Sequence, residues 1–196
     1  MKEAEKLKSG CLYDANDPEL SELRLKCDDL CYELNRLRPS DLAARHELLK
    51  KILGAVDGDP EIVLPFRCDY GFNIRTGRNF YANANLVILD AAPVTFGSNV
   101  FIGPNCVFTT AGHPLDRVQR DKGLEIGKPI TVGDSVWFGA NVTVLPGVTI
   151  GSNVIIGAGS VVTRSIHDGV IAFGTPCRIV RPITEADRNR YQECRD

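Results

Sequence analysis

Three histidines, His46, His113 and His167, are the side chains of this sequence best suited to general-base chemistry. With an ordinary pKa of about 6.5, a histidine is mostly neutral at physiological pH and can accept a proton. His46 falls in a predicted helix and His167 in a short turn, and both are most simply surface residues. His113 precedes Pro114 at the point where the repeat is interrupted and a long loop leaves, and a lone loop histidine is by itself more often structural than catalytic.

The seven cysteines are the other groups that could react or bind a metal. Their odd number and scattered spacing fit reduced cytosolic thiols and not a disulfide framework. Cys27 and Cys31 are four residues apart and would share one face of a helix. A zinc site needs two more ligands nearby, and none is evident, so we expect ordinary thiols and no metal. The cysteines are Cys11, Cys27, Cys31, Cys68, Cys106, Cys177 and Cys194.

The composition is that of an ordinary globular protein, with 196 residues of which 43% are hydrophobic and 24% charged. A formal net charge of −2 and the lack of a long basic run argue against nucleic acid as the main partner. No stretch approaches the roughly 18 apolar residues that a membrane span needs. The charged first residues lack the apolar core of a secretory signal. We therefore expect a cytoplasmic protein without a membrane partner.

Residues 1–58 are predicted to form a helical segment. Asp17 is a favoured N-cap and Pro18 suits the first helical position, and apolar residues at helical spacing continue to about Asn35. A second helix follows Pro39, and the turn at residues 57–60 closes it. Packing on a neighbouring domain is the simplest role of these helices.

From residue 74 the sequence repeats every six residues, in groups of three hexads that start at Ile74, Val94, Ile130 and Val148. Positions one and three are apolar, which indicates a short strand with two inward side chains. Position four is mostly Gly or Asn, residues that tolerate a positive φ, so we expect it to supply the turn.

Position four is neither Gly nor Asn only in the last hexad of each group, at Leu89, Thr109, Leu145 and Thr163. One coil should therefore contain about eighteen residues and three strands. Stacked at about 4.8 Å, such coils would build a triangular parallel β-helix over residues 59–183. The repeat does not reveal its handedness, and the general preference for right-handed crossovers favours a right-handed helix.

Two segments depart from the repeat. Residues 112–129 are a charged insertion between two coils, and a loop this long in a solenoid is typical of a functional segment. After Ser165 the pattern fades through a partial coil. Thr184 is expected to cap a short terminal helix over residues 184–196.

Taken together, these segments resemble the maltose and galactoside O-acetyltransferases, which belong to the hexapeptide-repeat acyltransferases. The resemblance implies a left-handed β-helix, against the general rule, and a homotrimer with active sites between subunits. It further implies acetyl-CoA as co-substrate, a sugar hydroxyl as acceptor and no required metal. It covers nearly the whole chain and is carried by residues 12–14 (LYD), 65–71 (PFRCDYG), 79–83 (NFYAN), 112–114 (GHP), 136–139 (VWFG) and 174–178 (GTPCR).

The resemblance implies that His113 is the general base, because the family's base occupies this GHP position. An alcohol must lose its proton as it attacks a thioester, and the thioester oxygen must then be stabilised. The simplest role for Asn83 is a turn residue with positive φ in place of Gly. The matching family residue also binds the acceptor and helps to stabilise the transition state. Cys106 falls at an inward position, so no covalent cysteine intermediate is expected.

The acceptor side should offer carboxylates and arginine, since a sugar has many hydroxyls and little apolar surface. Asp69 stands where the galactoside branch of the family has Ser, and this difference favours glucose or maltose as the acceptor. The hydroxyl that receives the acetyl group is expected to be the 6-hydroxyl. The register at Asp90 is uncertain by one residue, because Ala91 falls where some family members have an acid. The positions that match the family's acceptor-facing residues are Asp14, Arg24, Asp69, Tyr81, Asn83 and Asp90.

The donor side should be a groove of small residues that ends in cations, because coenzyme A has an apolar arm and anionic phosphates. Trp137, the single tryptophan, is outward at position two of its hexad, which suggests a ligand or subunit contact. The sequence has no glycine-rich loop for a nucleoside triphosphate or NAD. The residues that match the family's groove and phosphate positions are Ala140, Ala158, Thr163, Arg164, Arg178 and Arg181.

Three alternatives stay open from sequence alone. The same fold could acetylate an antibiotic, an amine or serine in place of a sugar. A zinc carbonic anhydrase would need three histidines to converge on one metal, and the three here are not placed for it. A non-enzymatic scaffold would not bind coenzyme A, and it would leave the GHP motif and the charged insertion unexplained.

Overall fold

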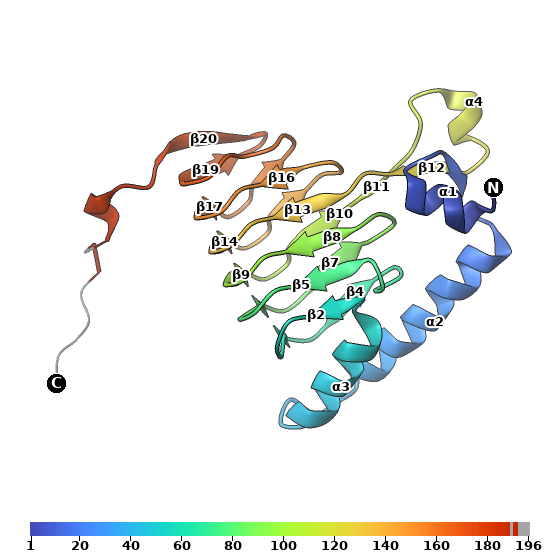
Figure 1. Cartoon of the computed structure of the whole chain (residues 1–196), viewed down its shortest axis with the longest axis horizontal. Coiled ribbons are helices and arrows are strands. Elements are labelled where there is room, and N and C mark those ends of the chain that lie inside the picture. Colours follow the sequence, from blue (N-terminus) through green and yellow to red (C-terminus); the bar gives the residue numbers. More distant parts are fainter. Residues whose placement is uncertain (189, 192–196) are drawn as a thin grey trace.

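The computed structural model describes residues 1–188, 190 and 191, and its body is a parallel β-helix (Figure 1). Each coil places one strand in each of three parallel sheets, here called sheets I, II and III. Sheet I contains β2 (Ala55–Val56), β5 (Ile74–Thr76), β8 (Val94–Phe96), β13 (Ile130–Val132) and β16 (Thr149–Ile150). Sheet II contains β3 (Glu61–Ile62), β6 (Tyr81–Ala82), β9 (Val100–Ile102), β14 (Val136–Phe138), β17 (Val154–Ile156), β19 (Val170–Gly174) and β20 (Cys177–Pro182). Sheet III contains β4 (Phe66–Cys68), β7 (Leu86–Leu89), β10 (Val107–Thr109), β15 (Thr143–Val144) and β18 (Val161–Val162).

Two edges of this triangular prism matter for function. The II–III edge is formed by the corners between sheets II and III, at residues 83–85, 103–106, 139–142 and 157–160. The III–I edge is formed by the corners between sheets III and I, at residues 69–73, 90–93, 110–129, 145–148 and 163–165. A side chain on one edge is separated from the other edge by the width of sheet III.

The inward side chains confirm the predicted hexad pattern. Positions one and three of the repeats fill the interior, and four phenylalanines from three successive coils contact one another there. Consecutive ring centroids in the series Phe80, Phe96, Phe108 and Phe138 lie 5.1, 5.1 and 5.2 Å apart. The contacts with Phe108 are edge-to-face, a geometry that adds to simple area burial. The core is therefore continuous along the prism.

The prediction for the corners was wrong in one respect: the positive φ lies at position six of the hexad and not at position four. Asn79 and Asn105, for example, have φ of 54° and 60°. Position four needs glycine for a different reason, since a Cβ on Gly139 would lie 2.6 Å from the backbone nitrogen of Ala158 in the next coil. Asn83, at position four, is not among the residues with positive φ in the described chain.

The β-helix begins earlier than the repeat. Strands β2, β3 and β4 pair in parallel with β5, β6 and β7 and form a complete first coil. The predicted boundary between residues 58 and 59 therefore falls inside this coil. Its corners, at residues 57–60 and at Leu64-Pro65, have Asp57 and Val63 where a hexad has Gly or Asn at position four, which is why the repeat did not reveal it.

The N-terminal segment contains three helices, α1 (Glu3–Ser9), α2 (Pro18–Asn35) and α3 (Leu42–Ile52), and the short strand β1 (Tyr13–Asp14). The side chain of Asp17 accepts hydrogen bonds from the backbone N–H groups of Glu19 and Leu20, so the predicted cap is confirmed. Helix α2 lies against β4, and its buried face joins the interior of the β-helix (Figure 1). No helix in the described part of the chain has the length and apolarity to cross a membrane.

The insertion forms β11 (Ala111–Gly112), the short helix α4 (Arg117–Arg120) and β12 (Leu124–Gly127), and it projects from the III–I edge (Figure 1). At the other end, β19 and β20 pair as an antiparallel hairpin. The predicted terminal helix is replaced, among the described residues, by a single 3-10 turn at Glu185–Asp187. The rest of that prediction falls on residue 189 and residues 192–196, which lie outside the described residues.

Candidate active site

A small antiparallel sheet joins the N-terminal segment to the base of the insertion. Strand β12 pairs with β1 on one side and with β11 on the other. Tyr13 lies opposite Glu125, and Asp14 lies opposite Leu124. His113 directly follows β11, so this sheet places the predicted base and Asp14 on the two sides of β12.

His113 has one ring nitrogen fixed and one free for chemistry. Its Nδ1 lies 2.9 Å from the carbonyl oxygen of Leu124. A carbonyl oxygen can only accept a hydrogen bond, so Nδ1 carries the proton of the neutral ring. The lone pair is then on Nε2, which is the atom that can take a proton from a substrate. The side chain is 51% exposed, so a substrate can reach it.

Glu125 is a functional candidate that the sequence did not reveal. Its Oε1 lies 3.7 Å from His113 Nε2, and its Oε2 accepts a hydrogen bond of 2.6 Å from the Tyr13 hydroxyl. Tyr13 is buried, and burial together with this bond raises the pKa of its hydroxyl. The carboxylate is thus positioned to pair with His113 once the ring is protonated. Only the pairing of β12 with β1 and β11 places it there, and the hexad repeat gives no signal of that pairing.

Arg24 and Asp69 approach the same edge from α2 and from the corner after β4. The Arg24 guanidinium donates hydrogen bonds of 2.6 Å to the Tyr70 hydroxyl and to the backbone oxygen of Ala15. Asp69 is half-buried, and burial raises the pKa of its carboxyl. Arg24 is therefore held in place by the protein, with Asp69 next to Tyr70 on the III–I edge.

Asp90 does not face solvent as the resemblance implied for an acceptor residue. Its side chain is fully buried, and Oδ1 accepts hydrogen bonds from the backbone N–H groups of Asp69 and Tyr70 at 3.0 and 2.8 Å. Its Oδ2 is buried and has no hydrogen-bond partner among the described residues. Burial raises the pKa of this carboxyl to about 6. Asp90 therefore supports the corner that carries Asp69, and it does not lie on the surface itself.

Asn83 and Tyr81 lie elsewhere, on sheet II and the II–III edge. Asn83 follows β6, and its side-chain oxygen accepts a hydrogen bond of 2.8 Å from the N–H of Ala84. Ala140 and Ala158 occupy the same edge in later coils, where the N–H of Gly159 donates to the oxygen of Ala140. The structure thus places Asn83 in line with two of the predicted groove residues.

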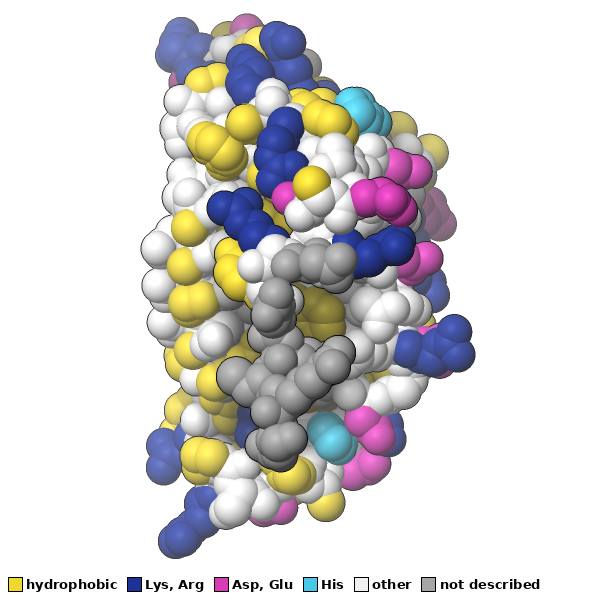
Figure 2. Space-filling model, turned by 90° about the vertical axis from the view of Figure 1, so that its left-hand side faces the viewer, with side chains coloured by type: hydrophobic (Ala, Val, Ile, Leu, Met, Phe, Trp, Pro, Cys, Tyr) yellow, Lys and Arg dark blue, Asp and Glu magenta, His cyan; other side chains and the backbone are white. Residues whose placement is uncertain are grey.

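The outward face of sheet II carries a row of aromatic side chains that runs from coil to coil. Tyr81, Phe101 and Trp137 are register neighbours on β6, β9 and β14. Trp137 is 54% exposed and Phe101 is 41% exposed. Figure 2 shows the side of the molecule that lies at the left of Figure 1, where hydrophobic side chains run down one flank beside Lys and Arg side chains. Trp137 is therefore an exposed aromatic surface, as its outward position predicted.

The two predicted catalytic residues do not meet within one chain. His113 belongs to the III–I edge and Asn83 to the II–III edge, with sheet III between them. One side of such a prism contains about six residues, which corresponds to roughly 15–20 Å. A catalytic side chain must lie within about 3 Å of the substrate atom with which it exchanges a proton or makes a hydrogen bond. A single chain therefore offers two half-sites.

Comparisons with known proteins agree with this architecture. Two family models match, the maltose acetyltransferase hexapeptide capping motif over residues 6–58 and the bacterial transferase hexapeptide of six repeats over residues 129–164. A putative acetyltransferase of Saccharomyces cerevisiae is 49% identical over 184 residues, 93% of this chain and 94% of that protein. Galactoside O-acetyltransferase of Escherichia coli is 42% identical over 187 residues, 95% of this chain and 92% of the relative. The chain belongs to the maltose and galactoside O-acetyltransferase family.

A solved structure supports the same assignment. A galactoside acetyltransferase in complex with coenzyme A superposes with a TM-score of 0.94 at 41% identity, covering 98% of this chain and 96% of that one. The match includes the helical N-terminal segment and the β-helix together. This chain therefore has the fold that the resemblance implied, a hexapeptide-repeat β-helix with N-terminal helices.

The predicted donor residues of this acetyltransferase are divided between the two edges. Thr163 and Arg164 follow β18 and lie exposed on the III–I edge, two coils beyond His113. Ala140 and Ala158 lie on the II–III edge, as described above. A groove that uses all four must therefore combine both edges.

The two remaining predicted cations lie on β20. Arg178 is exposed and lies opposite Phe173 in the hairpin. Arg181 is engaged by the protein, because its guanidinium donates two hydrogen bonds of 2.7 Å to the carboxylate of Asp187. This pair lowers the pKa of Asp187. Arg181 would have to leave Asp187 before it could bind a phosphate, so the structure does not present it as a free cation.

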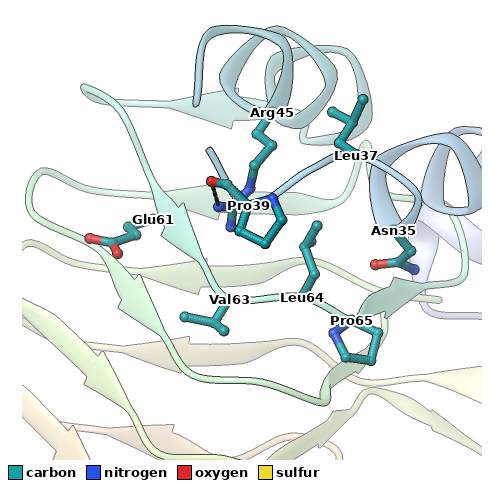
Figure 3. A pocket seen from close by; sticks show the side chains of 8 residues that line it. All are labelled: Asn35, Leu37, Pro39, Arg45, Glu61, Val63, Leu64 and Pro65. Atoms are coloured by element: carbon teal, nitrogen blue, oxygen red, sulfur yellow. Dashed lines mark hydrogen bonds between the residues drawn. The ribbon is translucent and has the colours of Figure 1, made fainter. Parts of the chain in front are cut away.

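A pocket of about 300 Å³ lies apart from these residues, between the helical segment and the first coil (Figure 3). Arg45 spans it from α3 and donates hydrogen bonds to the backbone oxygens of Pro39 and Ile62. None of the residues that line it was predicted to bind substrate. The lining residues are Asn35, Leu37, Pro39, Arg45, Glu61, Val63, Leu64 and Pro65.

Proposed function

We propose that this acetyltransferase transfers the acetyl group of acetyl-CoA to a hydroxyl of a sugar, of the maltose, glucose or galactoside type, at the 6-hydroxyl. The observation that carries the proposal is the tautomer of His113. Nδ1 donates to Leu124, which leaves the Nε2 lone pair exposed to a substrate. The coenzyme A bound to the related galactoside acetyltransferase supports the choice of donor.

The reaction proceeds by direct transfer. The sugar oxygen attacks the thioester carbonyl while His113 Nε2 takes its proton, and a tetrahedral intermediate forms. Its collapse breaks the carbon–sulfur bond, and the coenzyme A sulfur leaves with the proton from the imidazolium. Glu125 stabilises the imidazolium during this exchange, since its carboxylate lies 3.7 Å from Nε2. The acetyl oxygen, which becomes negative, is stabilised by Asn83 and by backbone N–H groups.

Each active site is formed by two copies of the chain, and the assembly is a homotrimer. The placement of the half-sites on separate edges of the prism supports a site shared between copies, and the number of copies is the one that the family resemblance implies. One copy supplies His113, Thr163 and Arg164 from its III–I edge. The neighbouring copy supplies Asn83 and its two groove alanines from the II–III edge. In a closed ring of three, every copy then uses both edges once.

The acceptor is bound by the polar groups around the base of the insertion. Asp14 reaches this place through the pairing of β1 with β12, and Arg24 through its bond to Tyr70. Asp69 is the residue that favours glucose or maltose over a galactoside. Its position is set by the buried Asp90, whose side chain accepts a hydrogen bond from the backbone N–H of Asp69. Carboxylates and a guanidinium in fixed positions can distinguish sugar hydroxyls by their orientation.

The test is thiol release from acetyl-CoA with glucose, maltose, a galactoside and chloramphenicol as separate acceptors. We expect release with a sugar, and a loss of at least about a hundredfold in kcat for His113→Ala, because general-base catalysis contributes about 10²–10⁴. The variant should still bind acetyl-CoA. His167→Ala is the matched control and should keep its activity. Near-normal kcat in His113→Ala would exclude this mechanism, and release with chloramphenicol alone would exclude a sugar acceptor.

A further inference from the structure

Three buried cysteines meet where helix α2 lies against the β-helix. Cys27 and Cys31 are one turn apart on α2, and Cys68 ends strand β4. The Sγ atom of Cys68 lies 3.5 Å from that of Cys27 and 3.8 Å from that of Cys31. All three Sγ atoms lie within 4.8 Å of one another. The sequence showed the pair on α2, and only the fold supplies the third thiol.

We propose that Cys27, Cys31 and Cys68 form a binding site for a thiophilic divalent cation of the zinc and cadmium class. A zinc ion binds a thiolate sulfur at about 2.3 Å, so two sulfurs of one tetrahedral site lie about 3.8 Å apart. A trigonal site would place them about 4.0 Å apart. The Sγ atom of Cys68 is separated from the other two sulfurs by 3.5 and 3.8 Å. The sulfurs therefore need to move only slightly to bind one ion.

The arrangement differs from that of the other buried cysteines. The thiol of Cys106, buried in the core alone, donates a hydrogen bond to the carbonyl oxygen of Gly139 at 3.2 Å. The thiols of the cluster face one another, with Cys68 as the shared neighbour of the other two, and the Cys27 thiol has only a longer contact of 3.8 Å with a carbonyl oxygen, that of Cys68. Filling the core requires no sulfur, since alanine or valine would serve equally well. Three sulfurs that converge from two separate elements are what a soft metal ion needs.

The donor set selects the class of ion. Among the described residues the group contains three cysteines and no carboxylate or histidine. Thiolates favour soft or borderline ions, whereas Mg²⁺ and Ca²⁺ prefer oxygen ligands. Each thiol that binds loses its proton to solvent as the sulfur–metal bond forms. A divalent ion on three thiolates leaves one net negative charge, less than a monovalent ion would leave in this buried place.

A disulfide is the competing chemistry of such a cluster. It would require two sulfurs to approach to about 2.05 Å, and it would leave the third thiol unused. It would also require an oxidant to accept two electrons. Metal binding uses all three sulfurs near their present positions and changes no oxidation state. The geometry therefore favours the ion.

An ion at this place would connect the two elements that position Arg24. Cys27 follows Arg24 by three residues on α2, and Cys68 immediately precedes Asp69. The bond from Arg24 to the Tyr70 hydroxyl spans the same two elements. The ion would clamp α2 to β4 and stabilise that contact. This consequence for acceptor binding rests on the proposed function, whereas the metal site itself does not.

The experiment is a titration of the reduced, metal-free protein with Cd²⁺ without oxygen, in a parent chain carrying Cys11→Ser and Cys194→Ser. Binding is followed by the ultraviolet band of the cadmium–thiolate bond and by equilibrium dialysis. We expect one Cd²⁺ per chain, and a loss of affinity of at least about a hundredfold in Cys68→Ala and in Cys31→Ala, since even changes outside the ligands cost 10–100-fold. Cys177→Ala, another buried cysteine, is the matched control and should bind as the parent does.

Because the three thiols are buried, the titration needs two further controls. Cd²⁺ is added both to the folded protein and during refolding, because the three thiols are at most 4% exposed. Circular dichroism shows whether each variant folds, and Cd²⁺ should raise the melting temperature of the parent but not of Cys68→Ala. Unchanged binding in both cluster variants would overturn the proposal. So would the absence of binding to a folded parent under both loading conditions, whether or not the enzyme is active.

Discussion

Glu125 Oε1 lies 3.7 Å from Nε2 of His113, the nitrogen that holds the lone pair of the neutral ring. The other carboxylate oxygen accepts a hydrogen bond from the buried Tyr13 hydroxyl. Tyr13 thereby holds the carboxylate in position. In the proposed mechanism, the carboxylate stabilises the positive charge that His113 gains when it takes a proton. Charge stabilisation of this kind acts in the transition state more than in the free enzyme.

Glu125→Gln should lower kcat about tenfold, equal to about 1.4 kcal/mol of transition-state stabilisation. The amide oxygen can still accept the Tyr13 hydroxyl, so the change removes charge and leaves the local packing. We expect KM for acetyl-CoA to stay within about twofold in steady-state kinetics. Asp121→Asn, an exposed acid of the same insertion, is the control. A variant with unchanged kcat, or with a lowered melting temperature, would contradict this role of Glu125.

Gly139→Ala should destabilise the folded protein by about 1–3 kcal/mol, because overpacking forces backbone to move. The new Cβ would lie 2.6 Å from the backbone nitrogen of Ala158 in the adjacent coil. Gly112→Ala is the matched control, since no atom lies within 4 Å of its added Cβ. Thermal unfolding of both variants measures the difference. Equal melting temperatures would show that position four does not need glycine for packing between coils.

The sequence predicted the β-helix because its physics is local and periodic. Two inward apolar positions in six residues are visible in any coil, and so is the cap of Asp17 on α2. The conformation of the corners was assigned to the wrong position, because Gly was read as a sign of positive φ. The structure shows that Gly139 is needed because a Cβ there would clash with the backbone of Ala158 in the neighbouring coil. This contact joins two different coils, so the hexad pattern does not reveal it.

The candidate site was predictable where one residue sits in a recognisable motif and not where contacts are long-range. His113 was predicted from the GHP motif that it shares with the family. Glu125 was missed because its role depends on the pairing of β12 with β1, which joins residues 112 positions apart. The burial of Asp90 was missed for the same reason, since its partners are the backbone N–H groups of Asp69 and Tyr70.

Asp90 should make the protein less stable as the pH rises. Its folded pKa of about 6 lies above the ordinary 3.8, so the folded state holds the proton more tightly than the unfolded chain does. This contribution is fully present below the unfolded pKa, and it is lost as the pH rises through about 6. A shift of about two units corresponds to about 3 kcal/mol.

Asp90→Asn cannot titrate, so the stability of the wild type relative to this variant should fall by about 2 kcal/mol between pH 4 and pH 7, the part of the full loss that lies in this range. Urea unfolding at the two pH values measures it. Asp41→Asn, at an exposed carboxylate without a side-chain hydrogen bond, is the control. A wild-type protein that gains stability relative to Asp90→Asn over this range would show that the buried carboxyl is ionised throughout.

His113→Ala and Asn83→Ala should complement each other when the two inactive variants assemble together. In the proposed assembly each active site takes His113 from one copy and Asn83 from the next, so a mixed assembly contains sites in which both residues are intact. In random equal mixing, about one quarter of the sites have this composition. Co-refolding the two variants and measuring thiol release should therefore restore about a quarter of the wild-type rate, whereas either variant refolded alone stays inactive. If the mixture remained inactive while light scattering showed co-assembly, the two residues would not share a site between copies.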